Sequence, residues 1–107
     1  MDGNNFFEFI NSPDIKSRLV AVEMLETLDA SHLENAFEKL KTDQSHLVRE
    51  AAIEHLHLYP QGYMLFLNDI DPKVRENVVN QASILPNPLQ IIKTASEDYS
   101  VSVRVAA

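Results

Sequence analysis

The stretch Asp71-Pro-Lys-Val-Arg75-Glu-Asn-Val78 occurs in related form four times along this chain of 107 residues. The other copies are Asp14-Ile-Lys-Ser-Arg18-Leu-Val-Ala21, Ser45-His-Leu-Val-Arg49-Glu-Ala-Ala52 and Ser100-Val-Ser-Val-Arg104-Val-Ala-Ala107. Successive arginines are separated by 31, 26 and 29 residues. Self-similarity at such a period is typical of repeat architectures, in which each unit buries its apolar face against its neighbours.

Each copy is predicted to open a helix. Asp or Ser stands four residues before the arginine, and such side chains accept hydrogen bonds from the free N–H groups of a first helical turn. Pro72 follows Asp71 at the first helical position, where a missing N–H is harmless. Apolar residues three and seven positions after the arginine predict one buried stripe; they are Ala21, Ala52, Val78 and Ala107, then Leu25, Leu56 and Ala82.

Aspartates stand six residues before the last three arginines, at Asp43, Asp69 and Asp98, whereas the first copy has Ser12. We expect these aspartates to lie in the turn before the helix and to pair with an arginine of their own or an adjacent repeat, since guanidinium and carboxylate form strong directed hydrogen bonds.

Further apolar segments lie between these helices, over residues 5–10, 31–40, 62–67 and 88–95. Ser31 and Glu34 have the spacing of a capping box. Pro60, Pro86 and Pro88 fall between segments, where helices should stop. The sequence therefore predicts an all-α chain in which two helices and a tight turn are repeated.

The pattern resembles the HEAT-like repeats of the phycobilisome-lyase type, whose second helix opens with an acidic turn and Val-Arg. The match covers nearly the whole chain; it is complete at 69–75 and 98–104, nearly so at 43–49, and departs at Ser17, where Val is usual. The resemblance implies one domain over 1–107, an α-solenoid of about four short HEAT-like helical hairpins with repeats at about 4–28, 31–59, 61–85 and 88–107.

Composition excludes several classes of function. Sixteen acidic and nine basic residues give a formal charge of −7, which disfavours direct binding of nucleic acid. The lack of cysteine excludes a thiolate nucleophile, and two glycines cannot form a phosphate cradle. The first 11 residues contain no basic residue and no apolar segment approaches the ~20 residues that span a bilayer, so a soluble, cytoplasmic protein is expected.

Metal chemistry has one weak candidate. On a helix expected over 45–59, four side chains would share a face: His46, Glu50, Glu54 and His57. A metal site needs ligands from a second helix, and the neighbouring segments offer Glu23, Glu26, Glu76 and Asn80 but no histidine. We therefore expect no metal, no cofactor and no catalytic residue, and interpret this face as solvated.

The arginines and aromatic residues have two interpretations each. Arg18, Arg49, Arg75 and Arg104 could form a basic ladder for phosphate, as in HEAT-like glycosylases, but the accompanying aspartates favour a structural role. The phenylalanines at 6, 7, 9, 37 and 66 have apolar neighbours and are expected in the core rather than on a binding platform.

Positions one and five past each arginine should face outward along the inner curve in the repeats that this chain resembles. These positions hold Leu19 and Glu23, Glu50 and Glu54, and Glu76 and Asn80. We expect a non-enzymatic protein-interaction module, or scaffold, that binds a basic or amphipathic protein partner through Glu23, Glu50, Glu54, Glu76 and Asn80. An acidic inhibitor that blocks a nucleic-acid-binding site on its target is the alternative, and a metal-dependent HEAT-like enzyme is the third.

The last predicted helix ends on Val105-Ala-Ala without a polar cap. A solenoid end normally presents a polar face to water. We expect either that the chain is a piece of something longer or that another molecule covers this end, which includes self-association through the C-terminal helix.

Overall fold

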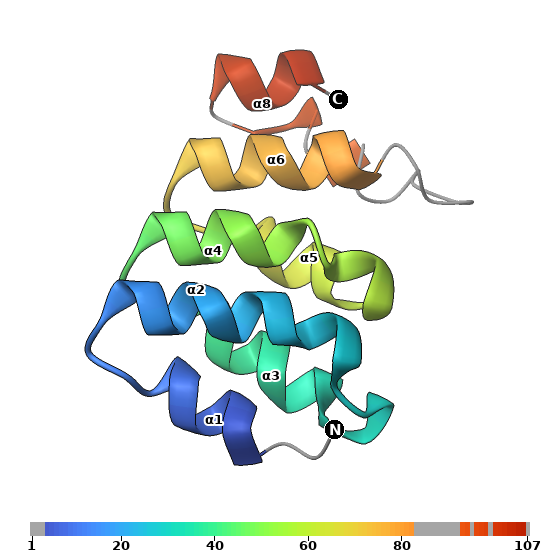
Figure 1. The fold of residues 1–107 in the computed structure, drawn as a ribbon. Coiled ribbons are helices and arrows are strands. Elements are labelled where there is room, and N and C mark those ends of the chain that lie inside the picture. The colour runs from blue at the N-terminus through green and yellow to red at the C-terminus, as the bar shows by residue number, and fades with distance from the viewer. Residues whose placement is uncertain (1–3, 83–92, 95, 99, 107) are drawn as a thin grey trace.

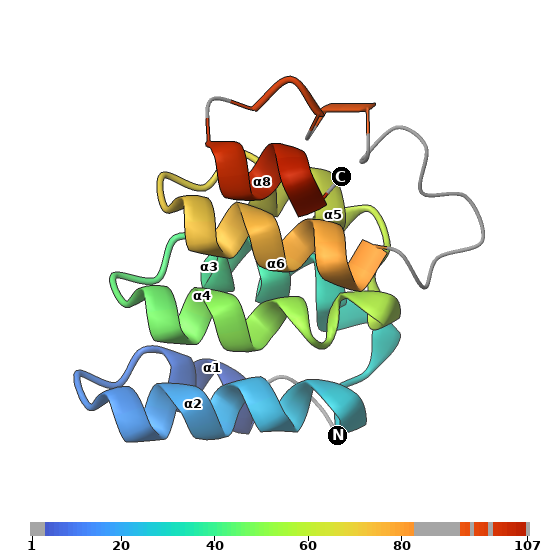
Figure 2. The same ribbon diagram turned by 90° about the horizontal axis from the view of Figure 1, so that it is seen from above.

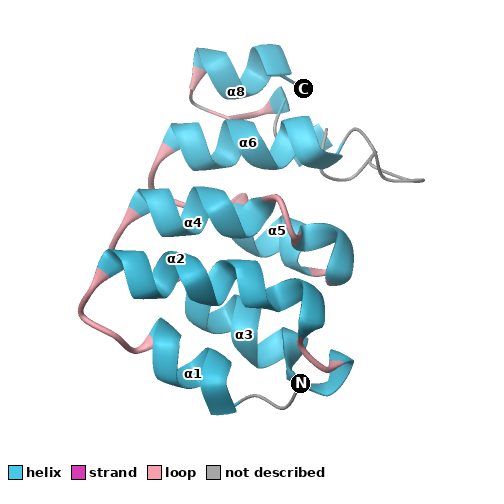
Figure 3. Cartoon of the chain, in the orientation of Figure 1, coloured by secondary structure: helices cyan, strands magenta, loops and turns pink. Residues whose placement is uncertain are grey.

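The computed structural model describes residues 4–82, 93–94, 96–98 and 100–106. Within these ranges the regular elements are all helices and no strand occurs (Figure 3), which confirms the predicted all-α class. The α-helices are α1 (Asn4–Ile10), α2 (Ile15–Met24), α3 (Leu33–Leu40), α4 (His46–Ile53), α5 (Gly62–Phe66), α6 (Pro72–Ala82) and α8 (Val101–Ala106). Short 3₁₀ helices are η1 (Leu25–Thr27), η2 (Ala30–His32) and η3 (Leu56–Leu58).

The helices form two layers. In one layer α2, α4, α6 and α8 lie side by side in chain order (Figure 1), and each packs on the next. In the other layer α1, α3 and α5 lie behind them (Figure 2), where they pack on α2, α4 and α6 respectively. The layer of α2, α4, α6 and α8 is called the arginine layer below, because its helices carry Arg18, Arg49, Arg75 and Arg104.

The helix starts of the arginine layer are fixed by side-chain caps. Asp14 Oδ1 accepts from the Lys16 N–H at 3.0 Å, and Ser45 Oγ accepts from the Leu47 N–H at 3.2 Å. Asp71 Oδ1 likewise accepts from Lys73 at 2.9 Å. These bonds satisfy donors that have no partner inside the helix, so the predicted caps at these three positions are confirmed.

The core lies between the two layers and contains the predicted stripe. Residues three and seven positions after each arginine are buried, namely Ala21, Ala52 and Val78, then Leu25, Leu56 and Ala82, while Ala107 lies outside the described residues. Phe6, Phe37 and Phe66 are also fully buried, and Phe7 packs at the edge of the core. Phe9 is 38% exposed, so its predicted burial is wrong; it lies on the outer side of α1, one position from buried Ile10.

Three arginines connect successive turns. Arg18 Nε donates to Asp43 Oδ2 at 3.0 Å, Arg49 Nε to Asp69 at 2.8 Å and Arg75 Nε to Asp98 at 2.7 Å. Each of these arginines therefore pairs with the aspartate in the next turn along the row. The predicted aspartate–arginine pairing is confirmed, and of the two alternatives the carboxylate binds the arginine of the preceding helix in the layer. The same guanidinium groups also donate to their own turn, six residues back, as in Arg49 Nη1 to the Asp43 carbonyl at 2.6 Å.

The aspartates complete these connections. Oδ1 of Asp43, Asp69 and Asp98 accepts from the N–H two residues later, at 2.9, 2.9 and 2.8 Å. Because the three guanidinium groups are largely buried and already bound to carboxylates and carbonyls, they are not a ladder for phosphate. The structural interpretation of Arg18, Arg49 and Arg75 is therefore the correct one.

The predicted capping box at Ser31 and Glu34 is wrong. Ser31 belongs to η2 and α3 begins two residues later, with His32 in the capping position and no side-chain bond there, so Ser31 and Glu34 form no capping box. The tight turn 29–32, closed by the His32 N–H on the Asp29 carbonyl at 2.9 Å, occupies the place of the cap. The predicted helix over 88–95 lies mostly outside the described residues.

The helix predicted over 45–59 is shorter in the structure. α4 ends at Ile53, and η3 follows with the Tyr59 N–H bonded to the Leu56 carbonyl at 2.9 Å. Pro60 explains part of the difference, because a residue before proline avoids the α-helical conformation. Side chains on either side of residue 54 therefore do not share a continuous helical face.

Candidate partner-binding site

The predicted binding residues lie on the arginine layer and are called the acidic ridge; they are Glu23, Glu50, Glu54, Glu76 and Asn80. A helix turns by 100° per residue, so a position five past a buried arginine points nearly opposite the core, and a position one past it points to the flank. Glu23, Glu54 and Asn80 are accordingly exposed, whereas Glu50 and Glu76 are half-buried.

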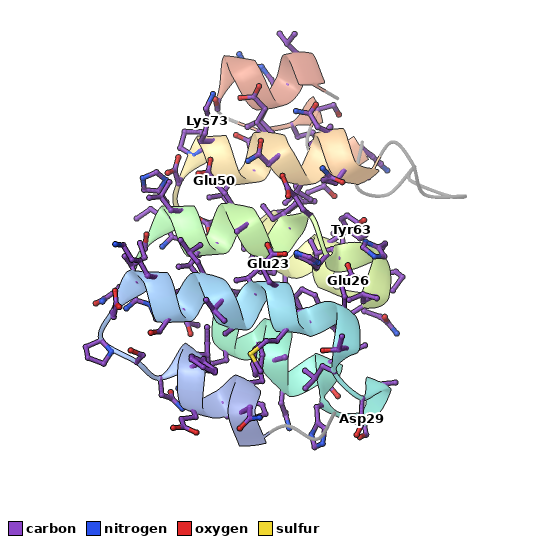
Figure 4. All side chains as sticks on the ribbon, viewed as in Figure 1. Glu23, Glu26, Asp29, Glu50, Tyr63 and Lys73 are labelled. Carbon is purple, nitrogen blue, oxygen red and sulfur yellow. The ribbon has the colours of Figure 1, made fainter. Side chains whose placement is uncertain are left out.

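Glu50 is the most constrained member of the ridge. Its side chain is 21% exposed, its Oε2 lies 3.2 Å from His46 Nδ1, and its Oε1 accepts from Asn77 Nδ2 of α6 at 3.4 Å. Figure 4 labels Glu50 between α4 and α6. This carboxylate therefore connects two helices of the layer and is less available to a partner than Glu23 or Glu54.

Charged side chains lie at both ends of the helices in the arginine layer. Lys16 and Lys73 lie in the first turns of α2 and α6, next to the acidic caps Asp14 and Asp71. Glu23 lies in the last turn of α2, and Glu54 directly follows α4. In Figure 4 Lys73 lies near the left-hand end of the layer, and Glu23 and Glu26 lie toward the right. Two of the four ridge glutamates, Glu23 and Glu54, thus lie at carboxyl ends, while Glu50 and Glu76 lie within α4 and α6.

This placement opposes the helix dipole. The carboxyl end of a helix carries a partial negative charge, so stability favours basic residues there and acidic residues in the first turn. α2, α4 and α6 have neither an acidic residue in the first turn nor a basic residue in the last. α3, in the other layer, has the favourable arrangement, with Glu34 in its first turn and Lys39 in its last.

The weak metal candidates are not brought together. Of the four, only His46 and Glu50 are in contact; His57 Nε2 instead lies 3.2 Å from Glu26 Oε1, and Glu54 makes no side-chain hydrogen bond or ion pair with the described residues. Within the described part of the chain, no group of three or more His, Cys, Asp or Glu side chains is arranged to hold a metal ion.

Sequence reasoning missed a carboxylate between two histidines. His55 Nδ1 lies 2.7 Å from Glu26 Oε1, the oxygen that His57 also contacts. The hydrogen bond from His55 holds the pKa of Glu26 below its usual value, while partial burial opposes the shift. Both histidines lie in the turn and 3₁₀ helix that follow α4, where a continuous helix was expected.

Two hollows lie on a different part of the surface, along the edge where the turns follow one another. The larger has a volume of about 380 Å³ and is lined in part by Arg18, Asp43, Lys39 and Thr42. The second, of about 230 Å³, shares Thr42 and reaches Asp69. Arg18, Asp43 and Asp69 in these linings are already bound in the connections between turns, so the hollows do not form a separate reactive site.

No helix within the described ranges combines the length and the apolar character that a membrane span requires. Comparison of the chain with protein-family models, with curated proteins and with solved structures gives no match.

Proposed function

We propose that this chain is a non-enzymatic protein-interaction module whose acidic ridge binds a basic or amphipathic segment of a protein partner. The observation that carries the proposal is the position of Glu23 and Glu54 at the carboxyl ends of α2 and α4. Each such placement opposes stability by about 0.3–1 kcal/mol, whereas a lysine at the same position would add to it.

A cationic partner would turn this unfavourable placement into a favourable one. Carboxylates and the unpaired carbonyls of helix ends add to one negative potential, which attracts positive charge and steers its approach. α3 of the opposite layer has the favourable arrangement, whereas α2 and α4 each carry a glutamate at the carboxyl end, in the case of α2 despite its acidic cap Asp14 at the amino end.

Apolar side chains on the same layer support an amphipathic partner. Val20 of α2 is 47% exposed and Leu47 of α4 is 52% exposed, and Leu19 is half-buried beside them. Contact with such side chains would hold a partner that charge alone brings close, because charged rims contribute mainly to the rate and specificity of binding.

The architecture that would present this ridge is an α-solenoid of about four short HEAT-like hairpins. The row of α2, α4, α6 and α8 and the arginine connections between turns support this interpretation, since stacked repeats contact only their neighbours. A solenoid would place one ridge position of each repeat in a single line.

The test uses charge reversal with a matched control. Glu23→Lys/Glu54→Lys alters two exposed ridge residues, and Glu8→Lys/Glu38→Lys alters two exposed residues of α1 and α3. Both variants change the formal charge by the same amount. The probe is a synthetic amphipathic peptide rich in lysine and leucine, titrated by fluorescence anisotropy at low and physiological salt.

The ridge variant is expected to bind the peptide at least about tenfold more weakly than wild type, because two lost charge contacts of about 0.7 kcal/mol each give this factor. The control variant is expected to bind with nearly the affinity of wild type. The circular dichroism spectra of both variants should be unchanged. Equal losses in the two variants would show that only net charge matters, and would count against the ridge. No binding to wild type at low salt would refute the proposed function outright.

A further inference from the structure

The outward face of the arginine layer is built from the same three positions on each helix. Because a helix turns by 100° per residue, positions two before, two after and five after a buried arginine point within about 40° of directly away from the core. The residues at these positions are Lys16, Val20 and Glu23 on α2, Leu47, Ala51 and Glu54 on α4 and its C-cap, and Lys73, Asn77 and Asn80 on α6. α2 and α4 therefore combine apolar and acidic side chains on this face, whereas α6 presents a cation and two amides.

We propose that α2 and α4 together bind one amphipathic helix of the partner, which lies across both helices with its apolar stripe on Val20 and Leu47 and two basic side chains on Glu23 and Glu54. This inference rests on the proposed function and specifies which structure the partner has and how it lies. Three features carry it: the exposed apolar side chains, the pair of carboxylates, and the change of surface at α6.

The apolar side chains precede the carboxylates along both helices. Val20 is 47% exposed and Leu47 is 52% exposed, while Ala51 is half-buried and packs against the core. Val20 lies one helical turn before Glu23, and Leu47 lies two turns before Glu54. The boundary between apolar and acidic side chains thus runs across the two helices. In an amphipathic helix the corresponding boundary runs along the helix axis, so the two surfaces match when the partner lies across α2 and α4.

The two carboxylates determine the spacing of the basic residues. Glu23 and Glu54 are both exposed and stand at the same position on neighbouring helices, five residues after Arg18 and Arg49. Packed helices lie about 8–10 Å apart, which gives the approximate spacing of the pair. Residues seven apart on an α-helix share a face and lie about 10.5 Å apart along its axis. A crossing helix can therefore place one basic side chain on each carboxylate from a single flank.

α6 ends this surface. A basic segment that continued over α6 would meet the like charge of Lys73, which Figure 4 labels near the amino end of that helix. Asn77 Nδ2 donates to Glu50 Oε1 at 3.4 Å, so a polar contact bridges α4 and α6 where a partner would need apolar contact. The partner helix is therefore expected to cover α2 and α4 and to stop before α6.

The test uses two synthetic peptides of identical composition, each about 14 residues and about 21 Å long as a helix. Both contain one leucine stripe and two lysines among neutral, helix-favouring residues. In the matched peptide the lysines are seven residues apart on one flank of the stripe. In the displaced peptide the second lysine is moved by two residues, which rotates it by about 200°. Affinities are measured by fluorescence anisotropy at low salt.

Wild type is expected to bind the matched peptide at least about fivefold more tightly than the displaced peptide, because the displaced lysine leaves one carboxylate without a partner. Glu23→Gln/Glu54→Gln is expected to bind the two peptides with equal affinity. Equal affinity of wild type for the two peptides, or a preference that persists in the glutamine variant, would overturn the proposed arrangement.

The apolar contact is tested with Val20→Ser/Leu47→Ser. Ile70→Ser is the control, since Ile70 is 89% exposed but lies in the turn before α6. The double variant is expected to bind both peptides at least about tenfold more weakly than wild type and to keep its preference for the matched peptide, while the control binds as wild type does. Circular dichroism should be unchanged, because these side chains lie on the surface. An unchanged affinity of the double variant, or an equal loss in Ile70→Ser, would contradict the apolar contact.

Amide chemical shifts locate the bound peptide. Titration of the ¹⁵N-labelled chain with the matched peptide is expected to shift the amides of 16–26 and 46–55 and to leave those of 72–82 nearly unchanged; equal shifts on α6 would overturn the limit to two helices. Failure of wild type to bind either peptide would refute the proposed function together with this inference. Binding that depends on Glu23 and Glu54 but not on lysine spacing or on Val20 and Leu47 would retain the proposed function and overturn the crossing helix.

Discussion

Removal of the Asp69 carboxylate tests whether the arginine connections hold successive turns together. Asp69 Oδ2 accepts from Arg49 Nε at 2.8 Å, and its side chain is 4% exposed beside an arginine that is 12% exposed. Its other oxygen accepts from the Asp71 N–H at 2.9 Å, at the start of α6. Asp69→Ala therefore removes one partner of a buried ion pair and one bond of the turn together.

The expected loss can be worked from these two contacts. Breaking a buried pair by removal of one partner destabilises by about 3–5 kcal/mol, because the other charge stays buried without compensation. Arg49 keeps its bond to the Asp43 carbonyl at 2.6 Å, which places the expected loss for Asp69→Ala near the lower end, at about 3 kcal/mol. Asp69→Asn keeps an acceptor for the Asp71 N–H and is expected to lose about 1.5–2 kcal/mol.

Urea unfolding at pH 7 measures both variants, with Glu38→Gln as the control for a surface pair. Glu38 contacts Lys41 at 2.9 Å, but its side chain is 45% exposed, so its loss should be at most about 1 kcal/mol. A double-mutant cycle with Arg49→Leu isolates the pair from the other bonds of Arg49. A coupling free energy below about 0.5 kcal/mol, or equal losses for Asp69→Ala and Glu38→Gln, would refute the reasoning.

Three further outcomes are expected. Gly62→Ala places a methyl group 2.6 Å from Leu56 Cδ2 in the packed core, and urea unfolding should show a loss of about 1–2 kcal/mol. Phe37→Ala removes a fully buried ring and should lose about 3–5 kcal/mol in the same measurement. The hydrogen bond from Arg75 lowers the pKa of Asp98 below its ordinary value of 3.8. The Arg75–Asp98 pair therefore stabilises the folded chain at neutral pH, and this stabilisation is lost as the pH falls through the lowered pKa. In Arg75→Gln, NMR titration of the carboxyl groups should show the pKa of Asp98 return toward 3.8.

Features that depend on local chemistry could be predicted from the sequence. A helix cap requires only one side chain and the N–H groups that follow it in the sequence. The helix starts at Asp14, Ser45 and Asp71 could therefore be predicted without knowledge of the rest of the fold. The aspartate–arginine pairing could also be predicted, because both residues recur at a fixed offset and need each other when buried.

Features that depend on tertiary packing could not be predicted. The apolar periodicity continues past Ile53 through buried Leu56, yet the backbone changes from α-helix to 3₁₀ helix between them. His55, which contacts Glu26, lies at that change, and a periodic apolar pattern does not indicate where an α-helix gives way to a 3₁₀ helix. The metal hypothesis for His46, Glu50, Glu54 and His57 depended on the longer helix and lost its geometric basis with it.

The recurring and the varying positions of the arginine layer have different roles. Arg18, Arg49 and Arg75 are each largely buried and bonded to two turns, so a neutral residue in their place would leave a carboxylate without compensation. The position five residues after each of these arginines is exposed, so packing does not determine its side chain. Glu23 and Glu54 occupy this position in the first two copies, although the helix dipole disfavours an acidic residue there. The third copy has Asn80. Stability accounts for the recurring residue but not for the glutamates. A partner that binds the side chain at the exposed position would explain both glutamates, and it would contact α2 and α4 more strongly than α6.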